Sequence, residues 1–208
     1  MADKLTNKTA NLVKGEVVTV KGQLGFTKYL TRLLEGKELE EVCAKREYAT
    51  ETPHFEGTIV NPALIAKTKD ANGKPQPTDA ERVIAGKVYK KTDAEGNEIK
   101  VLSLEKKVSK EGKGSIAFGV KREDGLIHPI NLAGKSLLQG QDVTVTFVTR
   151  EYEYKGKKGL SQFLDAIVFE KEPELYKPQA RAGWATDEDA APAEEAPAET
   201  AEEEAMWQ

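Results

Sequence analysis

A regular alternation of apolar and polar positions near the end of the chain predicts a long β-hairpin at 141–170. In its first half Val143, Val145 and Phe147 are apolar. The other positions there are polar, basic or aromatic, with Val148 as the exception: Thr144, Thr146, Arg150, Tyr152 and Tyr154. Successive side chains of a strand point to opposite faces, so the first set can face a core while the second faces outward.

The outward positions of this hairpin combine cations with aromatic rings. Arg150, Tyr152 and Tyr154 lead into a turn that carries Lys155, Lys157 and Lys158. Aromatic faces stack on bases and cations meet phosphates, which is the chemistry that a single-stranded nucleic acid needs. The alternative is an ordinary hairpin with a solvated face, since tyrosine is common in strands.

The remaining pattern predicts a chain made mainly of strands. Partial alternation or an extended, apolar character marks strands at 16–24, 55–68, 82–91, 98–108, 115–120 and 126–132. In the second of these, Pro62 indicates a bend or a sheet edge. The loop expected at 69–78 holds Asn72–Gly73 and two prolines, which exclude both a helix and a strand ladder.

One segment, 26–44, is open to two interpretations. Its apolar residues have the i, i+3, i+4, i+7, i+8 spacing of an amphipathic helix: Phe26, Tyr29, Leu30, Leu33 and Leu34. We expect a helix here, and a long strand followed by a short helix is the alternative. The choice decides whether Phe26 and Tyr29 belong to the core or to a nucleic-acid-binding face.

A second predicted hairpin, 82–108, repeats the combination of cations and aromatic rings. On its first strand Lys87, Tyr89 and Lys91 share one face, with Ile84 and Val88 on the other. From 82 to 122 there are eleven Lys and Arg residues against five Asp and Glu. This is the most basic region of the chain.

Charge is distributed unevenly over the 208 residues, whose net charge is −4. The last 24 residues, 185–208, contain nine acidic residues and no basic ones. The rest of the chain therefore has 31 Lys and Arg against 26 Asp and Glu, a balance of +5. A basic body points to a polyanionic partner, and an acidic tail can compete for that partner's site or bind a second protein.

Several function classes lose support from the sequence. A single cysteine, Cys43, allows no intramolecular disulfide and no zinc site built on cysteines. His54 and His128 lie far apart without an acidic or cysteine cluster beside them, so we expect no metal, no cofactor and no enzymatic activity. The chain has no apolar run long enough to span a membrane and no secretion signal, so we expect no membrane partner and a cytoplasmic location.

Six or more strands with at most two helices predict an all-β domain. We expect an OB-fold-like five-stranded Greek-key barrel at 15–176, with extra hairpin and helix insertions. Residues 1–14 are expected to be a flexible N-terminus. Residues 177–208 are expected to be a disordered acidic tail, because Ala, Glu, Asp and Pro cannot bury enough apolar surface to offset chain entropy.

The β-rich body, the late basic–aromatic hairpin at 143–169 and the acidic tail with an aromatic residue near its end, at 202–207, together resemble the single-stranded DNA-binding proteins of tailed bacteriophages. The resemblance is in architecture over most of 15–208. It implies that the barrel coats single-stranded DNA in replication, recombination and repair, in the host cytoplasm if the chain is phage-encoded. It also implies that the tail recruits replication proteins, namely a polymerase and a helicase or primase, through Glu202, Glu203, Glu204 and Trp207. Trp207 is penultimate here, whereas the family's tails end in an aromatic residue.

The leading hypothesis is therefore a non-enzymatic protein that binds single-stranded DNA. Tyr89, Tyr152 and Tyr154 would stack on bases, and the cations that would pair with phosphates are Lys87, Lys91, Arg150, Lys155, Lys157 and Lys158. One alternative is a phage structural or interaction β-domain whose partner is a protein, and another is an RNA-binding or nucleic-acid-modifying enzyme. The sequence leaves open the preference between DNA and RNA, the site size and whether the chain forms a homodimer.

Overall fold

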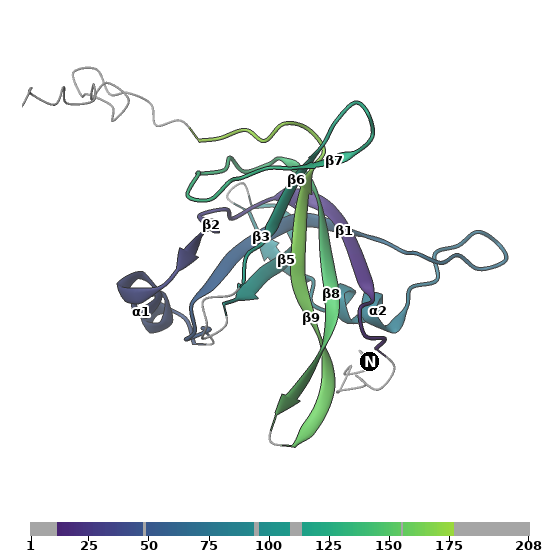
Figure 1. The fold of residues 1–208 in the computed structure, drawn as a ribbon, viewed down its shortest axis with the longest axis horizontal. Coiled ribbons are helices and arrows are strands. Elements are labelled where there is room, and N and C mark those ends of the chain that lie inside the picture. Colours follow the sequence, from purple (N-terminus) through teal and green to yellow (C-terminus); the bar gives the residue numbers. More distant parts are fainter. Residues whose placement is uncertain (1–11, 48, 94–95, 109–113, 155, 177–208) are drawn as a thin grey trace, which may run out of the picture. The chain divides into compact units, whose positions relative to one another are not determined.

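The computed structural model describes residues 12–47, 49–93, 96–108, 114–154 and 156–176 (Figure 1). Within them the helices and strands follow one another as β1 (Val17–Leu24), β2 (Tyr29–Leu34), α1 (Gly36–Lys45), β3 (His54–Ile65), α2 (Asp79–Ala85), β4 (Tyr89–Thr92), β5 (Glu98–Lys107), β6 (Ala117–Lys121), β7 (Ile127–Pro129), β8 (Asp142–Tyr154) and β9 (Lys157–Phe169). This described part of the chain is all-β with two short helices, as the pattern predicted.

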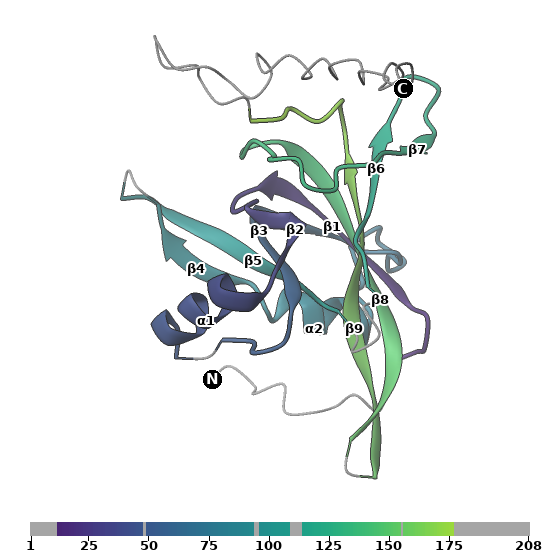
Figure 2. The same ribbon diagram turned by 60° about the vertical axis from the view of Figure 1, so that its left-hand side comes forward.

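All described strands belong to one sheet, whose order is β4-β5-β3-β1-β8-β9-β6-β7, with β2 paired to β3. The sheet curls so that β5 also lies close to β9 (Figure 2). Strands β1, β3, β5, β9 and β8 thereby follow one another in a ring, which is the strand order of the five-stranded OB barrel. The predicted OB-like class is confirmed, with β2, β4, β6, β7 and the helices as additions.

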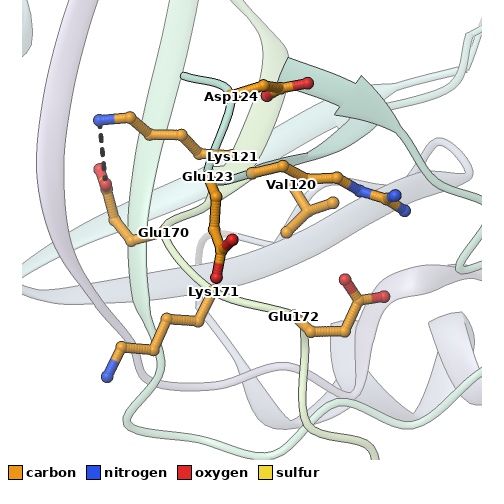
Figure 3. A pocket seen from close by; sticks show the side chains of 8 residues that line it. Val120, Lys121, Glu123, Asp124, Glu170, Lys171 and Glu172 are labelled. Carbon is orange, nitrogen blue, oxygen red and sulfur yellow. Dashed lines mark ion pairs between the residues drawn. The ribbon is translucent and has the colours of Figure 1, made fainter. Parts of the chain in front are cut away.

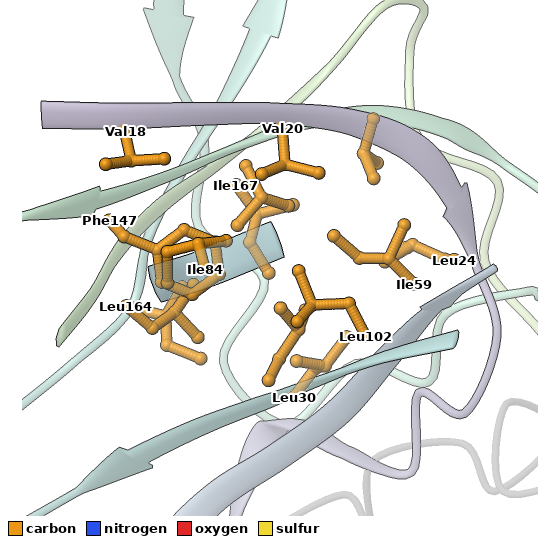
Figure 4. Packing of buried hydrophobic residues seen from close by; sticks show 14 of the residues in the cluster. Val18, Val20, Leu24, Leu30, Ile59, Ile84, Leu102, Phe147, Leu164 and Ile167 are labelled. Atoms are coloured by element: carbon orange, nitrogen blue, oxygen red, sulfur yellow. The ribbon is translucent and has the colours of Figure 1, made fainter. Parts of the chain in front are cut away.

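The barrel interior is filled by aliphatic side chains from every one of these five strands. Figure 4 shows Val18 and Val20 of β1 packed with Ile59 of β3, Leu102 of β5 and Ile167 of β9, all of them buried. Burying each such side chain contributes about 1.5–3 kcal/mol. The alternation predicted for the first strand of the 141–170 hairpin is confirmed, since the apolar positions of β8 are buried: Val143, Val145 and Phe147.

Leu30 enters the barrel from β2 through a gap that a glycine leaves open. A Cβ added at Gly57 of β3 would lie only 2.5 Å from Cγ and Cδ2 of Leu30. The Leu30 side chain is fully buried in the main core. Glycine at 57 is therefore what allows β2 to pack this closely against β3.

The helix expected over 26–44 is wrong in its first half. Residues Tyr29–Leu34 form strand β2, and the helix α1 begins only at Gly36, so the alternative interpretation was correct. The strand is buried on both sides: Leu30 packs into the barrel, while Tyr29 and Leu34 form a separate small cluster with Leu39 of α1. Burial on two sides removes the period of two, which is why the spacing imitated a helix.

The strand expected over 82–91 is also wrong in part. Its first residues belong to helix α2, and β4 begins only at Tyr89, so Lys87 precedes the strand. The helix is started by a capping box, in which the Thr78 hydroxyl accepts from the Glu81 N–H and the Glu81 carboxylate accepts from the Thr78 N–H. A threonine followed three residues later by glutamate is a recognisable start signal in the sequence.

Glu81 ties three segments together from a fully buried position. Its Oε1 accepts from the backbone N–H of Lys67 at 3.1 Å, and its Oε2 accepts from that of Thr78 at 2.9 Å. The Thr78 hydroxyl in turn donates to Glu16, just before β1. A buried carboxylate is costly unless it is hydrogen-bonded in this way.

Replacing Glu81 with alanine should lower the free energy of unfolding by about 2–4 kcal/mol, because two N–H groups lose their acceptor and a cavity opens. Asp79→Ala is the control, since it removes a 38% exposed carboxylate that pairs with Arg82. It should change stability by about 0.5 kcal/mol or less. Urea unfolding measures both, and equal losses for the two variants would contradict a structural role for Glu81.

Candidate nucleic-acid interface

The β8–β9 hairpin continues well beyond the barrel as an arm (Figures 1 and 2). Its ladder is antiparallel from Val143 opposite Phe169 to Tyr154 opposite Lys157. Buried positions on β8 end at Thr149, and every residue of that strand from Arg150 onward is exposed. The last five residues of β8 and their partners therefore form a surface rather than core.

The register divides the arm into two faces. Residues opposite one another share a face, so Arg150 lies with Ser161, Tyr152 with Gly159 and Tyr154 with Lys157. Phe163, opposite Val148, follows on the same side. We call this side the platform face and define it by five side chains: Arg150, Tyr152, Tyr154, Lys157 and Phe163.

The platform face carries planar groups at regular intervals. Tyr154 is 64% exposed and Tyr152 is 42% exposed. The Arg150 guanidinium lies over the Phe163 ring, 5.9 Å from its centroid, in a cation–π arrangement. Because alternate residues of a strand are about 6.6–6.8 Å apart, three successive planar groups form a row along β8. Such a row can receive the bases of an extended strand while Arg150 and Lys157 meet its phosphates.

The opposite face of the arm carries carboxylates that are paired with lysines. Glu151 and Glu153 lie there, and they pair with Lys14 at 3.1 Å and with Lys158 at 3.9 Å. Lys158 therefore lies away from the tyrosines with which the sequence grouped it. The sequence places three lysines in one turn, but it does not assign them to faces of the arm, because the face of each lysine depends on the pairing register between β8 and β9. Lys155 lies outside the described residues.

The second group of cations and aromatic residues predicted from the sequence, on the 82–108 hairpin, lies along the edge of β5. Tyr89 is opposite Val101, and Lys91 is opposite Ile99, where β4 pairs with the first half of β5. Tyr89 is 44% exposed and accepts a hydrogen bond at its hydroxyl from Ser103, at 3.4 Å. Strand β5 also lies near β9, and Lys106, close to the end of β5, interacts electrostatically with Asp165 of β9. The two predicted groups are thus connected through one strand, β5, rather than lying on unrelated surfaces.

Two lysines lie along this connection, and one of them was missed by sequence reasoning. Partial burial lowers the pKa of Lys106, a shift that Asp165 opposes and Arg150 increases. Burial likewise lowers the pKa of Lys87, with Glu105 opposing. A phosphate nearby would favour the charged form of both groups. The only sequence signal for Lys106 was its place in the most basic region.

A different, mixed-charge pocket lies where β6 and the end of β9 meet (Figure 3). At its edge Glu170 pairs with Lys121 at 3.8 Å and Lys21 at 3.5 Å, and accepts from the Thr144 hydroxyl at 2.9 Å. The hydrogen bond from Thr144, followed by the attraction of Lys21 and Lys121, lowers the pKa of Glu170. Three cations and four carboxylates line this pocket, so it offers a polyanion little net attraction.

The Glu170 network should make stability depend on pH in the acidic range. Because the folded-state pKa is below the ordinary 4.5, the network stabilises the protein fully above that value and is lost as pH falls through the folded-state pKa. Glu170→Gln should therefore be less stable than the unsubstituted chain at neutral pH, with the difference shrinking as pH falls below 4.5.

Thermal unfolding at a series of pH values measures this difference. Glu172→Gln is the control, because it removes a carboxyl from the same pocket but not from the network. A difference between Glu170→Gln and the unsubstituted chain that stays constant from neutral to acidic pH would contradict the assignment.

The described ranges contain no group of three or more His, Cys, Asp or Glu residues that could hold a metal ion. They also contain no helix of the length and apolar character needed to cross a membrane. The tail residues assigned by resemblance, Glu202, Glu203, Glu204 and Trp207, lie outside the described residues.

The strand order defines the class of this protein as an OB-type barrel with a β8–β9 arm. No protein-family model and no curated protein matches the chain. Among solved structures it is similar to the single-stranded DNA-binding protein from bacteriophage Enc34, at 13% identity and a TM-score of 0.34, covering 83% of this chain and 89% of that one. That phage protein in complex with ssDNA gives 12% identity and a TM-score of 0.35, covering 76% and 89%.

Two adjacent lysines provide a test of the platform face. Lys157 lies on that face and Lys158 on the opposite one, although both are exposed. Lys157→Ala should reduce the slope of log K against log salt concentration by about one for oligo-dT binding, the effect of one lost phosphate contact. Lys158→Ala, which leaves that face intact, should not change the slope. Fluorescence anisotropy measures both, and equal effects would contradict the assignment of faces.

Proposed function

We propose that this chain is a non-enzymatic single-stranded DNA-binding protein that coats DNA without sequence preference in phage replication, recombination and repair. The observation that carries the proposal is the platform face. It projects beyond the barrel, combines exposed tyrosines with Arg150 and Lys157, and excludes the acidic residues of the same arm. Aromatic groups interleaved with cations on an OB barrel are suited to single strands.

The energetics of this surface favour binding that ignores sequence. Lysine and arginine release counterions when they meet phosphates, and this term needs no base-reading group. Stacking on tyrosine adds about 1–3 kcal/mol per base and tolerates every base, because each has a π-face. The platform face offers both terms and no carboxylate of its own.

The proposed path of the strand continues from the arm to β4. Lys106 of β5 interacts electrostatically with Arg150 of the platform face. Lys87 interacts with Glu105 on the same strand β5, and Tyr89 pairs across from Val101 further along it. Tyr89 and Val101 share one face of the sheet, and residues 101 and 106 of β5 point to opposite faces, so a bound strand would cross the edge of β5 between Lys106 and Tyr89.

The tail fits this proposal as a competitor and a recruiting segment. It carries nine acidic residues between 185 and 208, and its last residues include Met206 and Trp207. A polyanion attached to the same chain can occupy a basic surface until DNA displaces it. When DNA is bound, the released tail would recruit a polymerase and a helicase or primase in the host cytoplasm.

A second candidate function is supported by one observation. Leu126, just before β7, and Ile127, its first residue, are 63% and 61% exposed. Exposed apolar neighbours are a feature of protein-binding surfaces. The candidate is a phage structural or interaction β-domain that binds protein instead of DNA.

Anisotropy with labelled oligo-dT tests the proposed function. The unsubstituted chain should bind tightly at about 50 mM salt and much more weakly at about 200 mM, because phosphate contacts are salt-dependent. Replacing Tyr152 and Tyr154 with alanine should cost about 1–3 kcal/mol for each stacked base, at either salt concentration. Leu126→Ala, which removes an exposed apolar side chain from a different hairpin, is the control and should bind normally.

The same assay examines the tail through a chain that ends at Trp184. Removal of the acidic residues should strengthen binding, most clearly at low salt. Binding that is insensitive to salt would count against the lysine and arginine contacts. If neither the full nor the shortened chain binds DNA, the single-stranded DNA proposal fails and the protein-binding candidate is favoured.

A further inference from the structure

Tyr152 and Gly159 face one another across the arm at unusually short range. They are paired in the β8–β9 ladder and share the platform face. A Cβ built at position 159 would lie 2.8 Å from each of three Tyr152 atoms, Cε1, Cζ and the hydroxyl oxygen. Carbon atoms do not approach this closely, so the ring occupies the volume that any side chain at 159 would need.

The three equal distances show how the ring is oriented. A point beside the edge of the ring, between Cε1 and the hydroxyl, would lie nearer to those two atoms than to Cζ. Equal distances instead place the point mostly above the ring plane. The hydroxyl end of the Tyr152 ring therefore lies over Gly159, and the residue remains 42% exposed, which leaves the ring accessible to solvent.

The backbone does not explain a glycine at this position. Gly156, in the turn of the same arm, has a φ of 74°, a conformation that favours glycine, but Gly159 lies in strand β9 and has no positive φ. Glycine inside a strand weakens it and often marks the close approach of another group. Here that group is the Tyr152 ring.

We infer that Gly159 is a positioning residue that holds the Tyr152 ring across the arm as a stacking surface for one base of a bound single strand. This inference rests on the proposed function. With Gly159 beneath it, the ring is already ordered before DNA arrives, so less side-chain freedom is lost on binding. The ring also lies between Arg150 and Tyr154 along β8, in the row of planar groups.

Gly159→Ala tests this inference without disturbing the backbone, because alanine is compatible with a strand and the clash falls on the far end of a side chain that can move. The methyl group should displace the ring and weaken oligo-dT binding by about 5- to 100-fold, close to the loss from Tyr152→Ala. The slope of log K against log salt should stay unchanged, because no cation is lost. Ser161→Ala, on the same strand and face, is the control and should bind normally.

A double-mutant cycle separates positioning from a general effect on the arm. Gly159→Ala should weaken binding in the Tyr152→Phe background, where a ring remains, and have no further effect in the Tyr152→Ala background. In NMR spectra of the unbound chain, the Gly159 Hα resonance should be shifted by the ring current, and Tyr152→Ala should abolish that shift.

The outcomes distinguish this inference from the proposed function. If the unsubstituted chain binds and Tyr152→Ala weakens binding, but Gly159→Ala binds normally or the two effects simply add, the positioning role is wrong and the function stands. If the unsubstituted chain does not bind oligo-dT, both fail.

Discussion

The register of the β8–β9 ladder is the constraint on which both the core and the candidate interface depend. It shifts once, between Thr146 opposite Ala166 and Phe147 opposite Leu164, so that Asp165 has no partner on β8. This bulge changes which residues of β9 face inward, and Leu164 and Ile167 are both buried as a result. Beyond it, the same register brings Gly159 and Lys157 beside Tyr152 and Tyr154, and Lys158 beside Glu153 on the opposite face.

Much of this arrangement could be predicted from the sequence, because a period of two reports directly on strands with one buried face. The strands at 16–24, 98–108 and both halves of 141–170 were found in this way. The predictions were wrong in two segments, 26–34 and 82–88, where the chain is not a strand with one buried face. Strand β2 is buried on two sides, and the capping box of α2 lay within a basic region that also suited a strand.

The candidate interface could be predicted only as far as alternation allows. Arg150, Tyr152 and Tyr154 fall on one face by parity within a single strand. Lys157 and Lys158 belong to the partner strand, so their faces depend on the turn and the register, which the sequence does not determine. The sequence could not predict that Lys106 lies near Arg150, because this proximity depends on the closure of the barrel between β5 and β9.

An arm that continues two barrel strands has a length that is independent of the barrel. Adding two residues to each strand near the turn would extend the platform face by one more cross-strand pair, with every existing side chain still on its own side. An insertion of a single residue in β9 alone would instead exchange the faces of all residues beyond it and bring Lys158 beside the tyrosines. The footprint on a nucleic acid can therefore be lengthened or shortened only in steps of two residues, while the core packing remains as it is.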